Sequence, residues 1–322
     1  MADDVALAVD IGGTFTDVVL RAGSNLFVEK TLTTPDDLLR GFFDGVHAVL
    51  AKAKLTPADV SGAIVHATTV VTNALIERKG PRAAMVFTRG FADILRIRDE
   101  RRYDMYDPQI EFPEPLVGPE HSFAVDERTY ADGSLGKRPS ERDIEELVRE
   151  LRRHGIESVG ICFLHSYRNA ENDQHVAREI RRRLPAVDIS QSSEIAPQIR
   201  EYLRASTTAV NAYTMPITRP YLDRLGRRLQ QEGFARSALI MLSSGGVVGP
   251  APAGRLPVRL APHSPRRPSG SITCLPSIWA APPRRSAWCA TSTRSSPASS
   301  RLTAATASRR AVACPSRSPA ST

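Results

Sequence analysis

AVDIGGTFTD, residues 8–17, is the stretch of this sequence that decides the fold. The apolar runs on either side, residues 5–9 and 18–20, predict two strands joined by a tight Gly-Gly-Thr turn. Adjacent glycines let a backbone turn tightly and bring bare amide groups close to a phosphate. An ordinary β-hairpin is the alternative, because Gly-Gly between apolar runs is a common turn. The carboxylates and threonines packed around this turn favour a phosphate-binding loop.

The polar residues of this loop have separate expected roles. Asp10 and Asp17 are acidic groups suited to holding Mg²⁺ or its waters, or to orienting a nucleophile. We therefore expect both to be catalytic and Asp10 to bind the metal. The expected phosphate-binding residues supply amide or hydroxyl donors: Gly12, Gly13, Thr14 and Thr16.

The bulk composition is that of a soluble globular protein. The chain has 322 residues, enough for two domains, with 41% hydrophobic and 24% charged residues. It begins without a basic and apolar leader and contains no apolar run of membrane-spanning length, so we expect a cytoplasmic protein without a membrane partner. The four cysteines lack metal-ligand spacing, and we expect no disulfide.

The positive charge of the chain belongs to its C-terminal part. The net charge is +8, yet every acidic residue precedes residue 233, and residues 1–232 carry a net charge of −4. Residues 262–322 form a low-complexity Arg/Ser/Pro tail, which we expect to be disordered or translated out of frame. A plain linker and a basic arm that binds nucleic acid, as in a non-catalytic interaction protein, are the alternatives. The body gives no charge argument for nucleic acid.

The order of predicted elements indicates an α/β protein. Three strands, a helix over residues 35–52, a strand, a helix over 68–78 and a strand over 83–87 follow the order of a ribonuclease-H-like unit. We assign this unit to residues 1–96, an irregular bridging segment to 97–138 and a second α/β region to 139–261. The second region includes two predicted helices, 198–213 and 216–232.

Three further groups of residues are candidates for a site. His66 ends a strand, and Thr68 or Thr69 would cap the following helix, whose first amides could hold an anion. His66 could bind substrate or move a proton, although a capped helix with a hydrogen-bonded histidine explains the pattern equally. Arg98 lies in an Arg/Tyr/Asp-rich stretch that could clamp a carboxylate or form a solvated surface. Residues 244–246, Ser244, Gly245 and Gly246, follow a strand and could approach a nucleotide or simply turn the chain.

These residues make the chain similar to the hydantoinase A/5-oxoprolinase family. The resemblance covers residues 4–261 and rests on ordered blocks: AVDIGGTFTDVVL (8–20), HATTVVTNALIERKG (66–80), TRGFADILRIRDERRYDMYD (88–107), REYLRASTTAVNAY (200–213) and MLSSGGVV (241–248). Members continue for hundreds of residues and carry a second Asp-x-Gly-Gly-Thr hairpin. No such motif follows here, which agrees with the out-of-frame interpretation of the tail.

The resemblance implies the N-terminal portion of an actin-like ATPase fold with ATP and Mg²⁺ as cofactors. Members spend ATP to activate a cyclic amide, of the hydantoin or 5-oxoproline type, for hydrolysis, or a ketone for carboxylation. We expect this chain to be weakly active or inactive, and the family implies a second, B-type subunit or a homo-oligomer. It places Asp10 to Asp17 at the phosphates, His66 among the catalytic residues, and a small cyclic amide against Thr68, Thr69, Asn73 and Arg98.

Overall fold

The computed structural model describes residues 4–99 and 106–261, which build two larger β-sheets with their helices and one small two-stranded sheet. The predicted tail, residues 262–322, lies outside the described residues. The β1–β2 hairpin follows from local sequence signals, whereas the pairing of strands distant in sequence does not.

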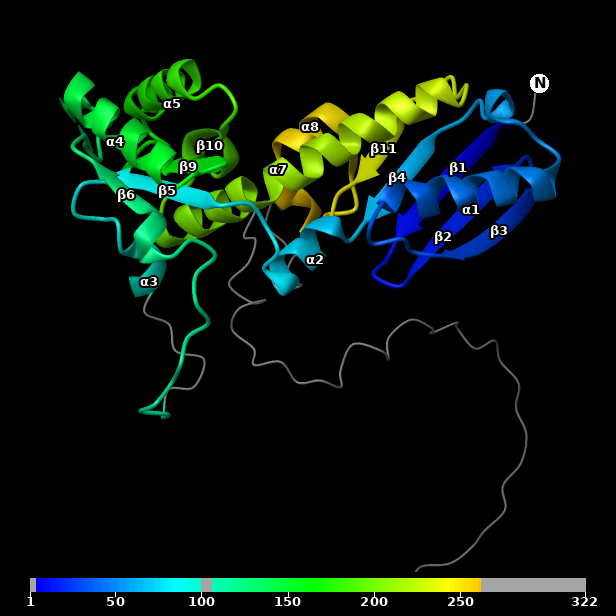
Figure 1. Cartoon of the computed structure of the whole chain (residues 1–322), viewed down its shortest axis with the longest axis horizontal. Coiled ribbons are helices and arrows are strands. Elements are labelled where there is room, and N and C mark those ends of the chain that lie inside the picture. Colours follow the sequence, from blue (N-terminus) through cyan, green and yellow to red (C-terminus); the bar gives the residue numbers. More distant parts are fainter. Residues whose placement is uncertain (1–3, 100–105, 262–322) are drawn as a thin grey trace, which may run out of the picture. The chain divides into compact units, whose positions relative to one another are not determined.

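The first sheet has six strands in the order β12-β11-β4-β1-β2-β3 (Figure 1). β1, β2 and β3 form an antiparallel meander, and β4 and β11 run parallel to β1. This order is that of a ribonuclease-H-like sheet, as predicted. The strand bounds are β1 Val5–Ile11, β2 Phe15–Ala22, β3 Asn25–Leu32, β4 Ile64–Thr68, β11 Ala238–Met241 and β12 Val247–Val248.

Helix α1, Leu38–Ala53, covers one face of this sheet. It begins where the Asp37 side chain accepts a hydrogen bond from the amide of Leu39 at 3.3 Å, a typical N-cap. Its own residues Phe42 and Phe43 are fully buried. Gly45 permits the close approach of the helix, because a Cβ there would lie 2.7 Å from Cγ2 of Val18.

The second sheet has four parallel strands in the order β10-β9-β5-β6. Its strands are β5 Ala83–Thr88, β6 Ser122–Val125, β9 Ser158–Cys162 and β10 Asp188–Gln191. Helices α4, Glu141–Arg153, and α5, Glu171–Arg183, pack beside it (Figure 1). All residues of β5 and β9 are buried, as is typical of parallel strands that are covered on both faces.

The remaining elements connect and cover these sheets. They are α2 Val70–Glu77, α3 Ile94–Ile97, the two-stranded pair β7 Arg128–Thr129 and β8 Leu135–Lys137, α6 Ser192–Ile195, α8 Pro250–Arg255 and the short 3₁₀ turns η1 Pro57–Asp59, η2 Pro119–His121 and η3 Pro257–Leu260.

Helix α7, Glu201–Gln231, corrects the prediction of two helices. Pro216 and Pro220 lie inside it and remove two amide donors, which led us to expect a break. The hydroxyls of Thr214 and Thr218 add hydrogen bonds to carbonyls four residues earlier, at 2.7 and 2.9 Å. Packing of α7 against β9, β10, α2 and α8 outweighs the local preference for a break.

Strand pairing differs from the predicted division of the chain in two places. β5 falls within the predicted first unit, residues 1–96, but pairs with β6 and β9 in the second sheet. β11 falls within residues 139–261 but returns to the first sheet beside β4. Order along a sequence does not specify which non-adjacent strands pair, so the division at residues 96 and 138 stays a prediction about folding units.

Candidate functional site

One edge of the first sheet gathers three loops. β1 and β4 are parallel with Ile11 beside Thr68, and β4 and β11 are parallel with His66 beside Ile240. The carboxyl ends of these strands therefore meet at one edge. The hairpin loop after β1, the start of α2 after β4 and the turn after β11 follow directly from it (Figure 1). Ligands of α/β proteins typically bind at this edge of a sheet.

The hairpin loop presents free amides. The amide of Gly12 donates to the carbonyl of Phe15 at 3.0 Å, which closes the turn. Within the described part of the chain, the amides of Gly13 and Thr14 donate no hydrogen bond, and both residues are exposed. Neither glycine adopts a left-handed backbone, so the turn does not depend on a positive φ at these two positions. Gly13 instead leaves space: the nearest atom to a Cβ there is Nδ2 of Asn73, at 4.0 Å.

Thr33 anchors this loop and was not predicted. Its hydroxyl donates to the carbonyl of Gly12 at 2.9 Å, and its amide donates to the carbonyl of Thr14 at 2.9 Å. The hydroxyl of Thr16 lies 3.1 Å from that of Thr33. Thr16 is 1% exposed, so its side chain supports the loop from the protein interior. It does not face solvent, contrary to the predicted phosphate contact.

The two predicted carboxylates are neighbours on adjacent strands. Asp10 pairs with Asp17 across β1 and β2, and Asp17 pairs with Lys30 across β2 and β3. Lys30 Nζ forms an ion pair with Asp17 at 2.7 Å. Asp10 has no hydrogen bond or ion pair to any residue that the structure describes. Partial burial raises the pKa of Asp10, and the charge of Asp17 raises that pKa further. A cation at Asp10 would relieve this repulsion.

His66 is a buried structural residue in this structure. Its Nδ1 lies 3.2 Å from the carbonyl of Val9, and its Nε2 lies 2.8 Å from the hydroxyl of Tyr221. The side chain is 0% exposed, and burial lowers its pKa to about 4. The ring is therefore neutral, with Nδ1 donating and Nε2 accepting. The expectation that His66 faces a cleft is corrected, because its side chain is buried and its ring contacts Tyr221 of α7.

The start of α2 holds the three other residues predicted near the loop. The amide and hydroxyl of Thr69 both donate to the carbonyl of Ile11, at 3.1 and 3.2 Å. Thr68 Oγ1 accepts a hydrogen bond at 3.2 Å from the amide of Val70, the first residue of α2. The Thr69 hydroxyl thus holds the start of α2 against β1, and the Thr68 hydroxyl ties it to the end of β4. Asn73 is different, because its amide group lies opposite Gly13 and contacts only Thr69 Oγ1, at 3.4 Å, within the described residues.

The Ser-Gly-Gly turn after β11 belongs to the same edge. The amide of Leu242 donates to the carbonyl of Gly246 at 2.7 Å, and the amide of Gly245 donates to the carbonyl of Leu242 at 2.9 Å. Gly245 has φ of 87°, so this turn needs its glycine. Ser244, Gly245 and Gly246 are exposed. The sheet register therefore brings this turn to the edge that carries the hairpin loop.

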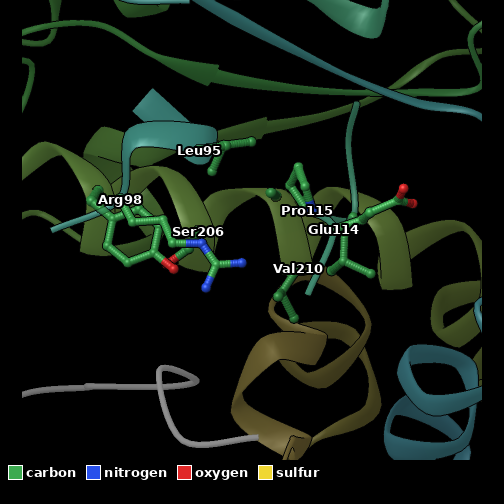
Figure 2. Close-up of a pocket in the computed structure, with 9 residues that line it drawn as sticks. Leu95, Arg98, Glu114, Pro115, Ser206 and Val210 are labelled. Atoms are coloured by element: carbon green, nitrogen blue, oxygen red, sulfur yellow. The ribbon is translucent and has the colours of Figure 1, made fainter. Parts of the chain in front are cut away.

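Arg98 does not join this edge. It lies at the end of α3 and lines a cavity of about 40 Å³ between α3, residues 114–116 and α7 (Figure 2). No residue of the hairpin loop or of α2 lines this cavity. The predicted contact of Arg98 with the same substrate as Asn73 has no support in this arrangement.

Several other features bear on the chemistry. Among the described residues, no group of three or more His, Cys, Asp or Glu side chains could hold a metal by itself. A metal at Asp10 would need further ligands from a bound molecule or water. Cys162 is a buried free thiol. None of the described helices is both long and apolar enough to span a membrane.

Comparison with known proteins gives two family matches. The model of the family described as Hydantoinase/oxoprolinase N-terminal region matches residues 6–184 of this chain. The model of the family described as Hydantoinase/oxoprolinase matches residues 204–266. Together they cover nearly all of the described residues, including the hairpin loop, α2 and the turn after β11.

Curated relatives include three proteins whose names indicate different activities. The chain is 32% identical to caprolactamase subunit alpha of Pseudomonas jessenii, over 75% of this chain and 36% of the relative. It is 28% identical to 5-oxoprolinase of Saccharomyces cerevisiae, over 76% of this chain and 22% of that relative. It is 27% identical to the acetophenone carboxylase gamma subunit of Aromatoleum aromaticum, over 75% of this chain and 35% of that relative. The chain thus spans about a third or less of the length of these relatives.

Two solved structures share the fold. An ATP-dependent caprolactamase from Pseudomonas jessenii superposes with a TM-score of 0.69 at 30% identity, covering 76% of this chain and 36% of that one. A nucleotide-free acetone carboxylase superposes with a TM-score of 0.71 at 23% identity, covering 80% of this chain and 39% of that one. The predicted fold class, an α/β actin-like ATPase fold, is confirmed for the described residues.

Proposed function

The chain belongs to the hydantoinase/oxoprolinase family, and from this premise we propose that it is the ATP-binding N-terminal part of a cyclic amide hydrolase. The observation that carries the proposal is the hairpin loop. The free amides of Gly13 and Thr14, the open space at Gly13 and the unpaired carboxylate of Asp10 lie together at the carboxyl edge of β1. Free amides beside a carboxylate suit a phosphate chain and its cation.

The chemistry follows from the weak reactivity of an amide carbonyl. Phosphorylation of the carbonyl oxygen of a cyclic amide makes the carbon susceptible to water, and it requires a clamp on the transferred phosphate. In this proposal the amides of Gly13 and Thr14 bind phosphate oxygens, and the Asn73 amide donates across the loop. Thr33 and Thr16 hold the loop in place, while Thr68 and Thr69 position α2. The exposed turn at residues 244–246 forms the neighbouring wall of the nucleotide site.

Asp10 fits a magnesium site in its chemistry. Its carboxylate has no partner among the described residues, and its pKa is raised partly by Asp17. Lys30 compensates Asp17, which leaves Asp10 as the group that gains most from a cation. Mg²⁺ commonly binds through one or two carboxylates together with substrate phosphates, whose charge it neutralises.

The rest of the reaction requires polypeptide beyond these sheets. The chain spans about a third of caprolactamase subunit alpha, and that relative and the acetophenone carboxylase gamma subunit are named as subunits. We therefore propose that turnover needs a further domain and a second subunit. Similarity to the acetophenone carboxylase subunit supports ATP-dependent ketone carboxylation as the second candidate.

The test measures ATP binding and ring opening separately. Calorimetry with ATP and Mg²⁺ should show binding by this chain, and binding should weaken when Mg²⁺ is omitted. Ring opening of hydantoin, 5-oxoproline and caprolactam should be absent with this chain alone. No ATP binding at millimolar concentration would overturn the nucleotide site. ATP-dependent ring opening by the chain alone would overturn the requirement for further polypeptide.

A further inference from the structure

The cavity that Arg98 lines lies apart from the proposed nucleotide site. It is the cavity of about 40 Å³ between α3 and α7, which exceeds the roughly 10–15 Å³ that one water requires. Arg98 and Ser206 lie at one end, and Glu114, Pro115 and Val210 lie at the other (Figure 2). The walls are mainly apolar. The lining residues other than these are Leu95, Leu116, Tyr202 and Ala209.

Arg98 is held at this cavity in a strained conformation. Its φ of 64° and ψ of −142° lie in a region that residues with a Cβ rarely adopt. The guanidinium donates to the carbonyl of Pro113 and stacks over the ring of Phe112 at 4.7 Å. Its other N–H groups donate no hydrogen bond to residues that the structure describes. Such strain persists where the surroundings fix it and is common at ligand sites.

Tyr202 supplies a second donor beside Arg98. Its side chain is half-buried at the cavity, and its hydroxyl has no hydrogen-bond partner within residues 4–99 and 106–261. Burial raises the pKa of Tyr202, the charge of Arg98 opposes this effect and the charge of Asp99 adds to it, so the phenol keeps its proton at neutral pH. A fixed cation and a phenol donor thus face an apolar space.

We propose that this cavity binds a small monocarboxylate. The carboxylate accepts hydrogen bonds from Arg98 and Tyr202, and a short hydrocarbon chain packs against Leu95, Ala209 and Val210. No residue of the hairpin loop or α2 contributes, so this binding does not depend on the proposed ATP site.

The experiment measures propionate binding to the full chain by ligand-observed NMR and calorimetry. Propionate should bind, because its carboxylate accepts hydrogen bonds from Arg98 and Tyr202. Arg98→Gln and Tyr202→Phe should each weaken propionate binding about tenfold or more, since each removes a donor to a charged group. Tyr130→Phe, a change at a half-exposed tyrosine remote from the cavity, should leave binding unchanged.

Circular dichroism separates loss of binding from loss of folding. Arg98 contacts Pro113 and Phe112, so Arg98→Gln could unfold this part of the chain. In that case Tyr202→Phe tests the proposal, because it removes only one unpaired hydroxyl. Absence of propionate binding, or binding that Tyr202→Phe leaves unchanged, overturns the proposal. ATP binding is measured in the same samples, so failure of this site and failure of the nucleotide site are distinguishable.

Discussion

The hydroxyl of Tyr221 on α7 lies 2.8 Å from Nε2 of His66 on β4, and 155 residues separate the two in sequence. Both side chains are buried, and the other ring nitrogen of His66 is bound to the carbonyl of Val9. This contact joins the long helix to the centre of the first sheet. Phe42 of α1 meets the same imidazole edge-on, with ring centroids 5.4 Å apart. His66 is therefore the point where β1, β4, α1 and α7 converge.

Tyr221→Phe tests this contact. The change removes the hydroxyl that donates to Nε2 and leaves a buried acceptor unsatisfied. We expect a loss of about 1–3 kcal/mol in the free energy of unfolding, measured by urea denaturation. Tyr130→Phe is the matched control, because Tyr130 is 51% exposed, and should change stability by less than about 0.5 kcal/mol. Equal effects of the two changes would contradict the role of the hydroxyl.

The buried His66 also predicts a dependence of stability on pH. Its pKa is about 4 in the folded chain, below the ordinary value of 6.5 for an exposed histidine, so the unfolded chain takes up the extra proton first as pH falls. Stability should therefore fall as pH drops from about 6.5 to about 4 and level off below that range. The full contribution is about 3 kcal/mol.

Carboxylates also titrate in this range, so the measurement requires a variant. His66→Gln retains a donor and an acceptor but does not titrate. The free energy of unfolding should depend on pH less steeply in this variant than in the natural chain. Parallel curves for the two proteins between pH 6.5 and 4 would show that His66 is not the group responsible.

Gly13→Ala separates folding from nucleotide binding. Gly13 has no left-handed backbone, and a Cβ there has Asn73 Nδ2 at 4.0 Å as its nearest neighbour, so the chain should fold normally. The methyl group would occupy the space proposed for phosphate, and we expect ATP binding to weaken about tenfold or more. Gly226→Ala in α7 is the control. Its Cβ meets nothing within 4 Å, so it should stabilise the helix by about 0.5–1 kcal/mol and leave ATP binding unchanged.

Thr33→Val tests the anchor of the hairpin loop. Valine has a similar shape but lacks the hydroxyl that donates to the carbonyl of Gly12 at 2.9 Å. We expect stability to fall by about 1 kcal/mol and ATP to bind more weakly, because the loop loses a restraint. Thr31→Val on the preceding strand is the control, since no hydrogen bond of the Thr31 hydroxyl is found among the described residues. An unchanged ATP affinity in Thr33→Val would remove Thr33 from the site.

Local signals explain which parts of the fold were predictable. The β1–β2 hairpin, α1 and α2 follow from apolar periodicity and turn residues within a few positions of each other, and the structure contains all of them. The continuity of α7 was not predictable, because Pro216 signals a break locally and only packing against distant strands overrides it.

For the candidate site too, the sequence predicted what depends on neighbouring residues and missed what depends on distant ones. Sequence brought Asp10, Gly12 and Gly13 together because they are neighbours on one turn. It assigned His66 to the cleft and missed Thr33, since the direction of each side chain depends on partners that only the folded sheet provides: Tyr221 for His66, and Gly12 and Thr14 for Thr33. Lys30 was missed for the same reason, because its pairing with Asp17 depends on the register of β3.

Asp17→Asn tests the coupling of the two carboxylates. The charge of Asp17 is one cause of the raised pKa of Asp10, and burial is the larger one. Removing that charge should lower the pKa of Asp10, and the ammonium of Lys30, released from its ion pair, should shift that pKa in the same direction. NMR titration of the side-chain carboxyl carbons measures this change directly. Asp36→Asn is the control, because Asp36 is exposed and pairs with Arg40 at the start of α1.

The same pair distinguishes the roles of the two aspartates toward magnesium. Asp10→Asn removes the carboxylate proposed to hold the cation, and ATP binding should then lose its dependence on Mg²⁺. Asp17→Asn keeps that carboxylate but releases Lys30, whose ammonium becomes free to compete for Asp10. We expect Asp17→Asn to weaken the Mg²⁺ dependence without abolishing it, as calorimetry with and without the metal would show. A Mg²⁺ dependence that survives in Asp10→Asn and disappears in Asp17→Asn would reverse the assignment and place the metal on Asp17.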